Sequence, residues 1–547
     1  MNETFEMVAK TFQGLEDVLA EELRNLGAYN VEPGRRMVAF EGDLAMLYKA
    51  NLCCRTALRI LKPIYKFTAT DTDTLYDAVK EFDWSSVLSI DKTFSIDTVA
   101  YSDEFTHSQF VTYRVKDAIV DWFRDRYGSD KRPGVRLQDA DVMINVHIAG
   151  DRVTLSLDSS GESLHKRGYR VAQTEAPINE VLAAGIILRS GWRGDCPLVD
   201  PMCGSGTFLV EAALIAANIN PGIYRKSFAF ENWKNFDAEL FDSLYNDDSG
   251  EREFNYKIYG ADISPKAVDI ASRNIKSAGV ARYIDLQVKP LSQWISAPAD
   301  GVLITNPPYG ERISADDMEG LYEMLGNKLK NVFKGYHAWI IGYRKEYFDM
   351  IHLSPSVKIP ILNGALECEL REYEIFDGDY KSFRKSGGKI HHGESQPRGR
   401  EKGDRDERRS MRKFKDDRRR SAANDEGDEA RYGSPRNKLE ERYSSRGGGF
   451  NRRDKYGRDK ERRDDRRDDR RDKFSRDSRS DKYGRDERRG RDSFGSRGSF
   501  APRGEAPAES ENPLAVRRNE AALKSITGRQ PSLAKPGVKM RPRNNSK

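Results

Sequence analysis

A third of this 547-residue chain is charged, which excludes a single packed core running through its whole length. The charge is unevenly distributed. From His391 onward there are 47 Lys and Arg against 30 Asp and Glu, an excess of +17, so the whole-chain net charge of +6 leaves −11 for the first 390 residues. We therefore expect a mildly acidic folded part followed by a basic tail.

Cysteine content and apolar runs indicate the compartment. The five cysteines, at 53, 54, 196, 203 and 368, show neither a paired framework spacing nor a CxxC motif. This favours a reducing cytoplasm and argues against structural zinc, so we predict no metal site. The N-terminus MNETFEMVAK has no apolar signal core, and no run is long enough to span a bilayer. We expect a cytoplasmic protein with no membrane partner.

The first sixty residues predict a small α+β module. Residues 5–12 have the pattern of a strand, and residues 14–26 that of an amphipathic helix ending at Gly27. Residues 31–41 supply a second strand region and residues 44–52 a second helix. This order is typical of a ferredoxin-like module, which we place at residues 1–65.

Residues 66–160 alternate helix and strand again. We predict helices over 73–82 and 108–127, and strands over 93–100, 141–149 and 152–158. The basic residues of this region either contact phosphate or form the solvated face of a helix and loop, and the pattern leaves both open. They are Arg114, Lys116, Arg124, Arg126, Lys131 and Arg132.

The segment LHKRGYR, at residues 164–170, places four basic residues and a tyrosine just before a helix that we expect to open at Pro177. Such a segment is either a lid or phosphate clamp between two domains, or an ordinary charged linker. Its candidate phosphate-binding residues are His165, Lys166, Arg167 and Arg170.

The stretch from Pro197 to Ala217 changes its periodicity where a ligand would bind. An apolar strand ends at residue 199, DPMCGSGT forms a tight loop over 200–207, and residues 208–217 have helical composition. The two loop glycines allow a ligand to approach the backbone, and the helix points its free N–H groups and positive dipole end toward it. An ordinary strand-to-helix turn is the alternative.

Residue identities distinguish the ligands that such a loop binds. A phosphate-binding P-loop needs Lys and then Ser or Thr after the second glycine, where this chain has Thr207 and Phe208. A nicotinamide fingerprint needs a third glycine at the position of Leu209. A strand-terminal acid followed by two close glycines suits a cofactor with a positively charged amino-acid group, and S-adenosylmethionine is the candidate. Its predicted contacts are Asp200, Cys203, Gly204, Ser205, Gly206 and Thr207.

A second apolar strand, over residues 301–305, ends in Asn-Pro-Pro-Tyr. We expect it at the same carboxyl edge of one parallel sheet, where the prolines make a rigid bend. The Asn306 side-chain oxygen and the Pro307 carbonyl would accept hydrogen bonds from an exocyclic base amine, and Tyr309 would stack on the base. A plain turn is the alternative for this motif alone, but after a glycine loop it indicates methyl transfer to an amine.

A strand over residues 257–262 lies between these two stretches in the sequence. Its terminal acid, Asp262, is placed to accept hydrogen bonds from the cofactor ribose hydroxyls. A capped helix over 264–279 and a strand over 284–288 follow. Cys203 as a covalent nucleophile is a disfavoured alternative, because methylation of an exocyclic amine needs no covalent step.

The motifs DPMCGSGTFLVEAA, TNPPYGERI and LHKRGYR, with the segment from Ala176 to Leu188, resemble the THUMP-containing class I methyltransferases. Among these they are most similar to the enzymes that methylate guanine N2 in large-subunit (23S) ribosomal RNA. The resemblance covers about residues 1 to 380 and is most specific in the second half of that span. This chain has Pro290 where such enzymes usually place an Asp for the adenine amino group, so that contact would fall to a backbone carbonyl or to Ser292.

The resemblance implies an α/β, Rossmann-like methyltransferase domain at 161–385, preceded by a THUMP RNA-binding domain at 66–160, with the basic residues of 164–170 contacting RNA. The expected reaction is direct methyl transfer from S-adenosylmethionine to guanine N2 in large-subunit rRNA or a ribosomal precursor. One alternative is an adenine-N6 methyltransferase acting on DNA or RNA, since Asn-Pro-Pro-Tyr serves both amines. Another is a non-catalytic RNA-binding assembly factor, although the joint presence of the site residues speaks against it.

Residues 386–547 have almost no aliphatic side chains and abundant Arg, Asp, Gly and Ser. Such a composition buries too little apolar surface to offset the entropy of ordering, so we expect a disordered tail. Single aromatic rings spaced among arginines fit loose RNA binding, and a solubilising tail is the alternative. Some members of the resembled family carry a second methyltransferase domain at this place.

Overall fold

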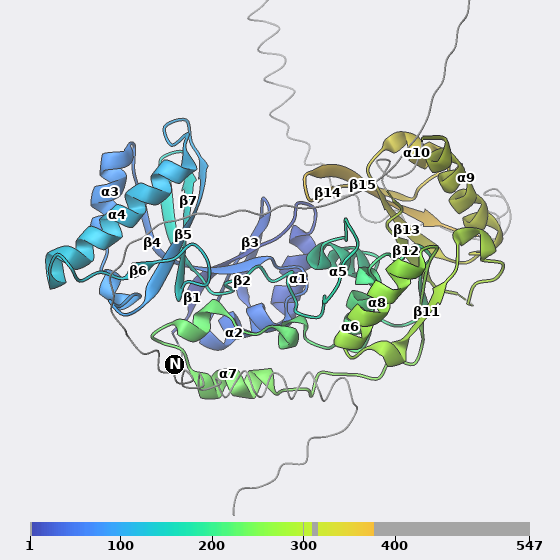
Figure 1. The fold of residues 1–547 in the computed structure, drawn as a ribbon, viewed down its shortest axis with the longest axis horizontal. Coiled ribbons are helices and arrows are strands. Elements are labelled where there is room, and N and C mark those ends of the chain that lie inside the picture. The colour runs from blue at the N-terminus through green and yellow to red at the C-terminus, as the bar shows by residue number, and fades with distance from the viewer. Residues whose placement is uncertain (1–2, 299, 309–314, 377–547) are drawn as a thin grey trace, which may run out of the picture. The chain divides into compact units, whose positions relative to one another are not determined.

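The computed structural model of the chain describes residues 3–298, 300–308 and 315–376 (Figure 1). Two β-sheets organise this part, one of eight strands and one of seven. The predicted tail and the predicted base-stacking Tyr309 lie outside the described residues. In the part described, no helix is both long and apolar enough to cross a membrane.

The first sheet joins the two expected N-terminal modules. Its strand order is β2-β3-β1-β4-β8-β7-β5-β6, and β4 pairs with β1 on one side and β8 on the other. The domain boundary expected at residue 65 therefore falls inside a strand. The strands are β1 (Phe5–Lys10), β2 (Tyr29–Gly34), β3 (Met37–Gly42), β4 (Arg59–Thr68), β5 (Thr93–Tyr101), β6 (Gly134–Val135), β7 (Val142–Ala149) and β8 (Arg152–Asp158).

Helices cover one face of this sheet, because their apolar residues share a core with one side of its strands. The region 31–41, predicted as one strand region, divides into the hairpin of β2 and β3, with Arg36 in the turn at φ +57°. The helices are α1 (Glu16–Asn25), α2 (Leu44–Cys53), α3 (Thr72–Glu81) and α4 (Ser108–Tyr127), with the short η1 (Trp84–Ser86).

The second sheet has the order β11-β10-β9-β12-β13-β15-β14. Its first five strands are parallel, and β15 runs antiparallel to both of its neighbours. The strands are β9 (Leu198–Asp200), β10 (Ile258–Asp262), β11 (Ile284–Val288), β12 (Val302–Thr305), β13 (His337–Gly342), β14 (Val357–Asn363) and β15 (Leu366–Glu374).

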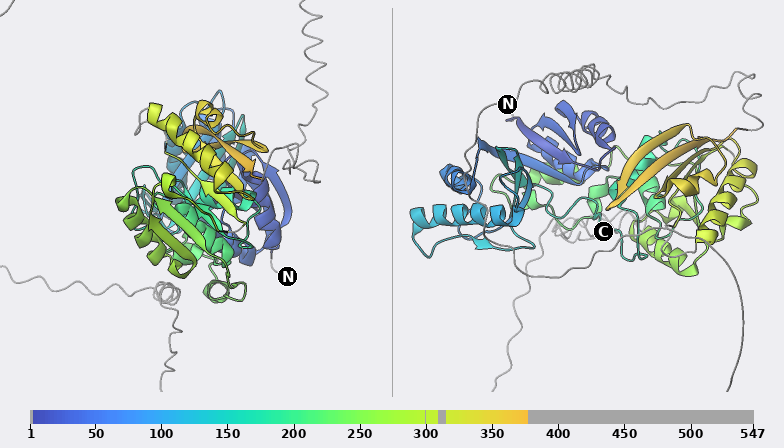
Figure 2. Two further views of the ribbon diagram at one scale, coloured as in Figure 1. Left: turned by 90° about the vertical axis from the view of Figure 1, so that its right-hand side faces the viewer. Right: turned by 90° about the horizontal axis from the view of Figure 1, so that it is seen from above.

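Helices cover both faces of the second sheet (Figure 1 and Figure 2). Alternate residues of each strand point to opposite faces, so Leu198 packs with α5, α6 and α8 while Val199 packs with α9 and α10. This doubly wound arrangement confirms the predicted α/β fold class. The helices are α5 (Glu180–Arg189), α6 (Thr207–Ala216), α7 (Ala238–Tyr245), α8 (Pro265–Ser277), α9 (Ala315–Asn331) and α10 (Lys345–Asp349), with η2 (Pro221–Tyr224), η3 (Ala229–Asn232), η4 (Ala281–Tyr283) and η5 (Leu291–Gln293).

Helix α5 begins at Glu180, three residues after the predicted start at Pro177. The cause is Asn179, whose side-chain oxygen accepts hydrogen bonds from the backbone N–H groups of Val181 at 2.9 Å and Leu182 at 3.4 Å. An Asn cap satisfies N–H groups of the first turn that have no partner within the helix, and this fixes the helix start more strongly than a preceding proline does.

Candidate active site

Three predicted site residues meet at the carboxyl edge of the second sheet. Asp200 ends β9, Asp262 ends β10, and Asn306 directly follows β12, and these strands are neighbours in the order β10-β9-β12. Each acid is hydrogen-bonded to a neighbouring element: Thr305 Oγ1, at the end of β12, donates to Asp200 Oδ1 at 2.8 Å, and the Gly204 N–H of the glycine loop donates to Asp262 Oδ2 at 3.0 Å. The strand order reverses here, the usual ligand position in such folds.

The two loop glycines have different functions. Both adopt left-handed backbone angles, φ +54° at Gly204 and +79° at Gly206. A Cβ on Gly206 would lie 3.0 Å from the Cβ of Ala271 on α8, so this glycine permits close packing of α6 against α8. A Cβ on Gly204 would meet no described heavy atom within 4 Å, so this glycine faces space that a ligand can fill.

Asp200 carries the most perturbed carboxyl of the site. Its side chain is buried, with 1% of the residue exposed, and burial raises its pKa to about 7. Hydrogen bonds from Thr305 and from the Met202 N–H, both made to Oδ1, act in the opposite direction but do not offset the burial. A buried carboxylate at a strand end gains most when a cationic ligand binds beside it.

Asp262 is held in one orientation by the backbone. Its Oδ1 accepts from the Ser264 N–H at 2.9 Å and its Oδ2 from the Gly204 N–H, which fixes the carboxylate against the glycine loop. The loop is held from the same strand, because the Cys203 N–H donates to the Ala261 carbonyl at 2.8 Å. Asp262 is partly exposed, so its carboxylate is accessible to accept hydrogen bonds from a ligand.

Cys203 does not have the environment of a nucleophile. The thiol is buried, and burial raises its pKa well above the ordinary value, with the carboxylates of Asp200 and Asp262 raising it further. Because the thiolate is the reactive form, this environment keeps the sulfur inert at neutral pH. The placement supports the interpretation in which methyl transfer proceeds without a covalent enzyme intermediate.

Arg170 points into the protein and supports the glycine loop. Its guanidinium donates to Glu180 Oε1 at 2.6 Å, to Ser205 Oγ at 3.2 Å and to Thr207 Oγ1 at 3.0 Å, with a further bond to the Ile178 carbonyl at 3.1 Å. Ser205 and Thr207 are buried, and their hydroxyl oxygens accept hydrogen bonds from this arginine. The sequence predicts Arg170 at an RNA phosphate, whereas these contacts favour a role in positioning the glycine loop.

Asn274, on α8, fastens the same segment from the other side, and sequence reasoning missed it. Its amide nitrogen donates to the carbonyls of Ala172 at 2.9 Å and Ser205 at 3.0 Å, while its oxygen accepts from the N–H groups of Val171 and Ala172. The buried amide of Asn274 thus makes four hydrogen bonds, two as donor and two as acceptor. An Asn on an otherwise apolar helix face was the only local signal.

Arg167 is also turned inward. Only 2% of it is exposed, and its guanidinium lies 3.5 Å from both oxygens of Glu211, a fully buried residue on α6. It also donates to the Arg55 carbonyl at 2.5 Å and the Leu164 carbonyl at 2.9 Å, and Tyr169 completes the cluster by donating to Glu211 at 2.8 Å. This burial is inconsistent with the expected RNA contact and gives Arg167 a structural role.

The other two basic residues of the segment lie differently. Lys166 is exposed and pairs with Glu162, four residues earlier in the sequence, at 2.5 Å. His165 is partly buried, with its Nδ1 2.8 Å from Ser163 Oγ, and desolvation lowers its pKa. Lys166 is thus the cation of 164–170 that faces solvent most openly.

Exposed apolar side chains complete the edge of the sheet, and sequence reasoning missed them. Ile263 follows Asp262, Val288 ends β11 opposite Asp262 in the parallel register, and Tyr343 follows β13. Ile263 is 72% exposed, so beside the strand-terminal acid it offers an apolar surface that a ligand can cover. The available signal was an apolar residue directly after a strand-terminal acid.

Pro290, where the resemblance leads us to expect an Asp, also has a defined place. Pro290 is the N-cap of η5, and the preceding Lys289 holds its ammonium 4.3 Å over the ring of Trp294. The Ser292 carbonyl accepts from Lys328 at 2.6 Å, so it is already engaged.

The residues at this edge fit S-adenosylmethionine. The open space at Gly204 admits the ligand backbone, buried Asp200 suits its ammonium, oriented Asp262 suits its ribose, and Ile263 suits its adenine face. Together with the doubly wound sheet, this set of side chains defines a class I methyltransferase that uses S-adenosylmethionine.

Comparisons with known proteins agree with this class. Three family models match consecutive parts of the chain: an RlmL ferredoxin-like domain at residues 6–61, a THUMP domain at 69–158 and an RMKL-like methyltransferase domain at 167–372. The chain is 39% identical over 371 residues to "Putative RNA methyltransferase slr0064" of Synechocystis, covering 67% of this chain and 96% of that protein. The chain therefore belongs to the THUMP-containing, RlmL-like methyltransferases.

Two further relatives extend the comparison. The chain is 39% identical to "Ribosomal RNA large subunit methyltransferase K/L" of Syntrophotalea carbinolica, over 69% of this chain but 54% of that protein, so it spans about half the length of that relative. The crystal structure of SMU.472, "a putative methyltransferase complexed with SAH", matches with a TM-score of 0.62 and 32% identity, covering 69% of this chain and 100% of that one.

Replacing Arg170 with Ala should weaken binding of S-adenosylhomocysteine by about tenfold, because two loop hydroxyls lose a shared donor and the loop gains freedom. Arg170→Lys should recover little, since a single ammonium cannot reach Glu180, Ser205 and Thr207 together. Calorimetric titration measures the affinity. Lys166→Ala is the matched control, and equal affinities in both alanine variants would contradict the positioning role.

Affinity for S-adenosylhomocysteine should rise with pH and level off near pH 7. Burial raises the pKa of Asp200 to about 7, so the free carboxyl is protonated below that value, whereas the ligand ammonium binds the anion. Each pH unit below 7 should therefore weaken binding roughly tenfold. Asp200→Asn should bind weakly with no such pH dependence. A flat profile in the unchanged protein, titrated from pH 5.5 to 8, would contradict this role.

The contribution of Asp200 to folding stability changes with pH in the opposite direction to its contribution to cofactor affinity. Its folded pKa lies above its unfolded value, so the contribution is fully present below about pH 4 and is lost as pH rises through about 7. Binding of the cofactor ammonium at neutral pH would thus offset the cost of ionising this buried carboxyl.

Proposed function

We propose that the protein transfers the methyl group of S-adenosylmethionine to the exocyclic N2 amine of a guanine in large-subunit rRNA. The observation that carries the proposal is the position of Asn306 and Pro307, which follow β12 directly and lie next to the Asp200 strand at the carboxyl edge. Two adjacent parallel strands thus hold Asn306 and Pro307, which would accept hydrogen bonds from the amine, beside the proposed cofactor site.

Positioning supplies most of the catalysis in this proposal. The bound cofactor supplies an electrophilic methyl group on a sulfonium. Asn306 Oδ1 and the Pro307 carbonyl would accept hydrogen bonds from the two amine N–H groups, which turns the nitrogen lone pair toward that methyl group. Two prolines in succession keep these acceptors fixed, so little reorganisation is needed at the moment of transfer.

The remaining residues orient the cofactor. We assign Asp200 to its ammonium and Asp262 to its ribose, with Gly204 to Thr207 along its amino-acid chain. Ile263 and Val288 would flank the adenine ring. Pro290 has no side-chain acceptor for the adenine amino group. Tyr309 remains the proposed stacking partner of the base, and the exposed ring of Tyr343 offers a second surface for it.

The choice of guanine in RNA comes from the surroundings of the site. Asn306 and Pro307 would accept hydrogen bonds from the conjugated exocyclic amine of either guanine or adenine once the base leaves its stack. The N-terminal THUMP domain and the name of the K/L relative, a ribosomal RNA large subunit methyltransferase, both support an rRNA substrate. Lys166 and His165 are the proposed RNA contacts of the 164–170 segment, and we place the reaction in the cytoplasm, on rRNA or a ribosomal precursor.

Deleting the gene tests the proposal. Ribosomal RNA and genomic DNA from the deleted and parent strains are digested to nucleosides and compared by mass spectrometry. We expect one N2-methylguanine to disappear from large-subunit rRNA and to return when the gene is restored, but not when the Asn306→Ala form is supplied. Loss of N6-methyladenine from DNA or RNA, with N2-methylguanine unchanged, would overturn the guanine assignment in favour of the adenine alternative.

A further inference from the structure

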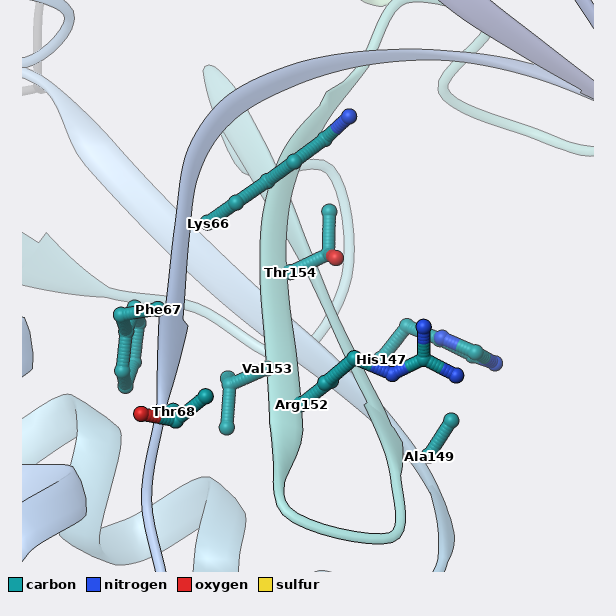
Figure 3. A pocket seen from close by; sticks show the side chains of 8 residues that line it. All are labelled: Lys66, Phe67, Thr68, His147, Ala149, Arg152, Val153 and Thr154. Carbon is teal, nitrogen blue, oxygen red and sulfur yellow. The ribbon is translucent and has the colours of Figure 1, made fainter.

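Among the residues that the structure describes, no helix covers one face of the first sheet around the ends of β4, β5, β7 and β8. Helices share a core with alternate residues of β4, β5, β7 and β8, such as Val153 and Ile148. The intervening residues point away from that core, and several are exposed. Figure 3 shows Lys66, Thr154, His147 and Arg152 on one side of their strands, with Phe67 and Val153 on the other. A depression of about 520 Å³ lies there.

Strand register arranges the open face into two rows. One row crosses four strands through Val99, His147, Thr154 and Lys66, and the next runs through Tyr101, Ala149, Arg152 and Thr68. With strands about 4.8 Å apart, each row is roughly 14 Å long, which accommodates a few nucleotides. Both rows therefore form one continuous platform.

Two rings lie at one end of the platform. Tyr101 is 66% exposed, and its ring centroid lies 6.1 Å from that of His147. Burial, together with the positive charge of Lys10, lowers the pKa of His147, so the imidazole is neutral at physiological pH. An exposed tyrosine beside a neutral imidazole offers flat surfaces on which unpaired bases stack whatever their sequence.

Two cations lie at the other end of the rows. Arg152 is exposed, and Lys66 is more than half exposed although it pairs with Glu6 on β1. On β5 the exposed carboxylate of Asp97, two residues before Val99, limits the platform on that side. Rings and cations across one open face match a chain that alternates bases with phosphates, and match a purely apolar partner poorly.

We propose that this face of β4, β8, β7 and β5 binds a single-stranded segment of the RNA substrate, with bases on Tyr101 and His147 and phosphates at Lys66 and Arg152. The inference rests on the proposed function for the identity of the RNA. It goes beyond that function by naming a second contact surface, remote in sequence from the residues that orient the reacting amine.

Binding of a fluorescein-labelled 12-nucleotide single-stranded RNA to the full-length chain tests the platform. Tyr101→Ala should weaken binding about tenfold, and His147→Ala by a similar factor. Arg152→Ala should weaken binding and lower the slope of log affinity against log salt by about 0.7. Unchanged affinity for S-adenosylhomocysteine checks that each variant is folded.

Matched controls sharpen the test. Tyr29→Ala removes a ring that is 65% exposed on β2, and Arg35→Ala removes an exposed cation in the turn between β2 and β3; both should bind RNA as the unchanged protein does. Equal effects of Tyr101→Ala and Tyr29→Ala would overturn the proposal, as would equal losses for a duplex of the same length. The binding assay needs no catalysis, so it stands even if the nucleoside comparison refutes the guanine assignment.

Discussion

Replacing Asn306 with Ala is expected to slow methyl transfer by a factor of about a hundred or more while leaving the affinity for S-adenosylhomocysteine nearly unchanged. In the proposed site Asn306 faces the base, whereas the cofactor is held by the strand-terminal acids of β9 and β10. Loss of one precisely oriented acceptor removes an interaction that counts most in the transition state. Single-turnover methylation of rRNA from the deleted strain measures the rate, and calorimetry measures the affinity.

Gly204→Val is the counterpart variant. Gly204 has φ +54° and faces open space, so a β-branched side chain there is strained and occupies the proposed cofactor volume. It should lose cofactor affinity, and its rate should recover in part at saturating S-adenosylmethionine. Loss of cofactor binding in Asn306→Ala, or an unchanged rate, would contradict the role assigned to the asparagine.

Sequence predicted the carboxyl edge of the sheet well because its signals are local. The acid at residue 200, the two glycines after it and the apolar run before Asn306 each lie within a few residues of the turn that they define. Helix α4 and strands β8 and β11 have the predicted bounds, since strong periodicity determined them. The α/β class followed from the alternation of such elements.

Contacts between distant residues were not predictable in this way. Arg167 has the sequence context of a surface cation, and only Glu211, 44 residues later, shows why it is buried. The same holds for Arg170, whose partners are Glu180 and the loop hydroxyls, and for Asn274, which reaches back 69 residues to Ser205. Charge density alone cannot tell a phosphate-binding arginine from one that neutralises a buried carboxylate.

The buried Arg167 therefore leads to the second large expected effect. Arg167→Ala should lower the free energy of unfolding by about 3 kcal/mol, because it leaves the carboxyl of Glu211 buried without its cation. The value belongs at the lower end for buried pairs, since the two nitrogen–oxygen distances are 3.5 Å and Tyr169 still donates to Glu211. Urea unfolding, followed by circular dichroism, measures the change.

The pH dependence of this loss distinguishes a broken buried pair from a general packing defect. Burial already raises the pKa of Glu211, and removal of the neighbouring guanidinium raises it further. A raised folded pKa contributes stability at low pH that is lost as pH rises, so the deficit of Arg167→Ala should be larger at pH 8 than at pH 5. Lys166→Ala, which removes an exposed cation one residue away, should change stability by less than about 0.5 kcal/mol at either pH. If Arg167→Ala instead folded normally and bound rRNA more weakly, the arginine would belong to the RNA surface and not to the junction between its own segment, the Arg55 backbone and α6.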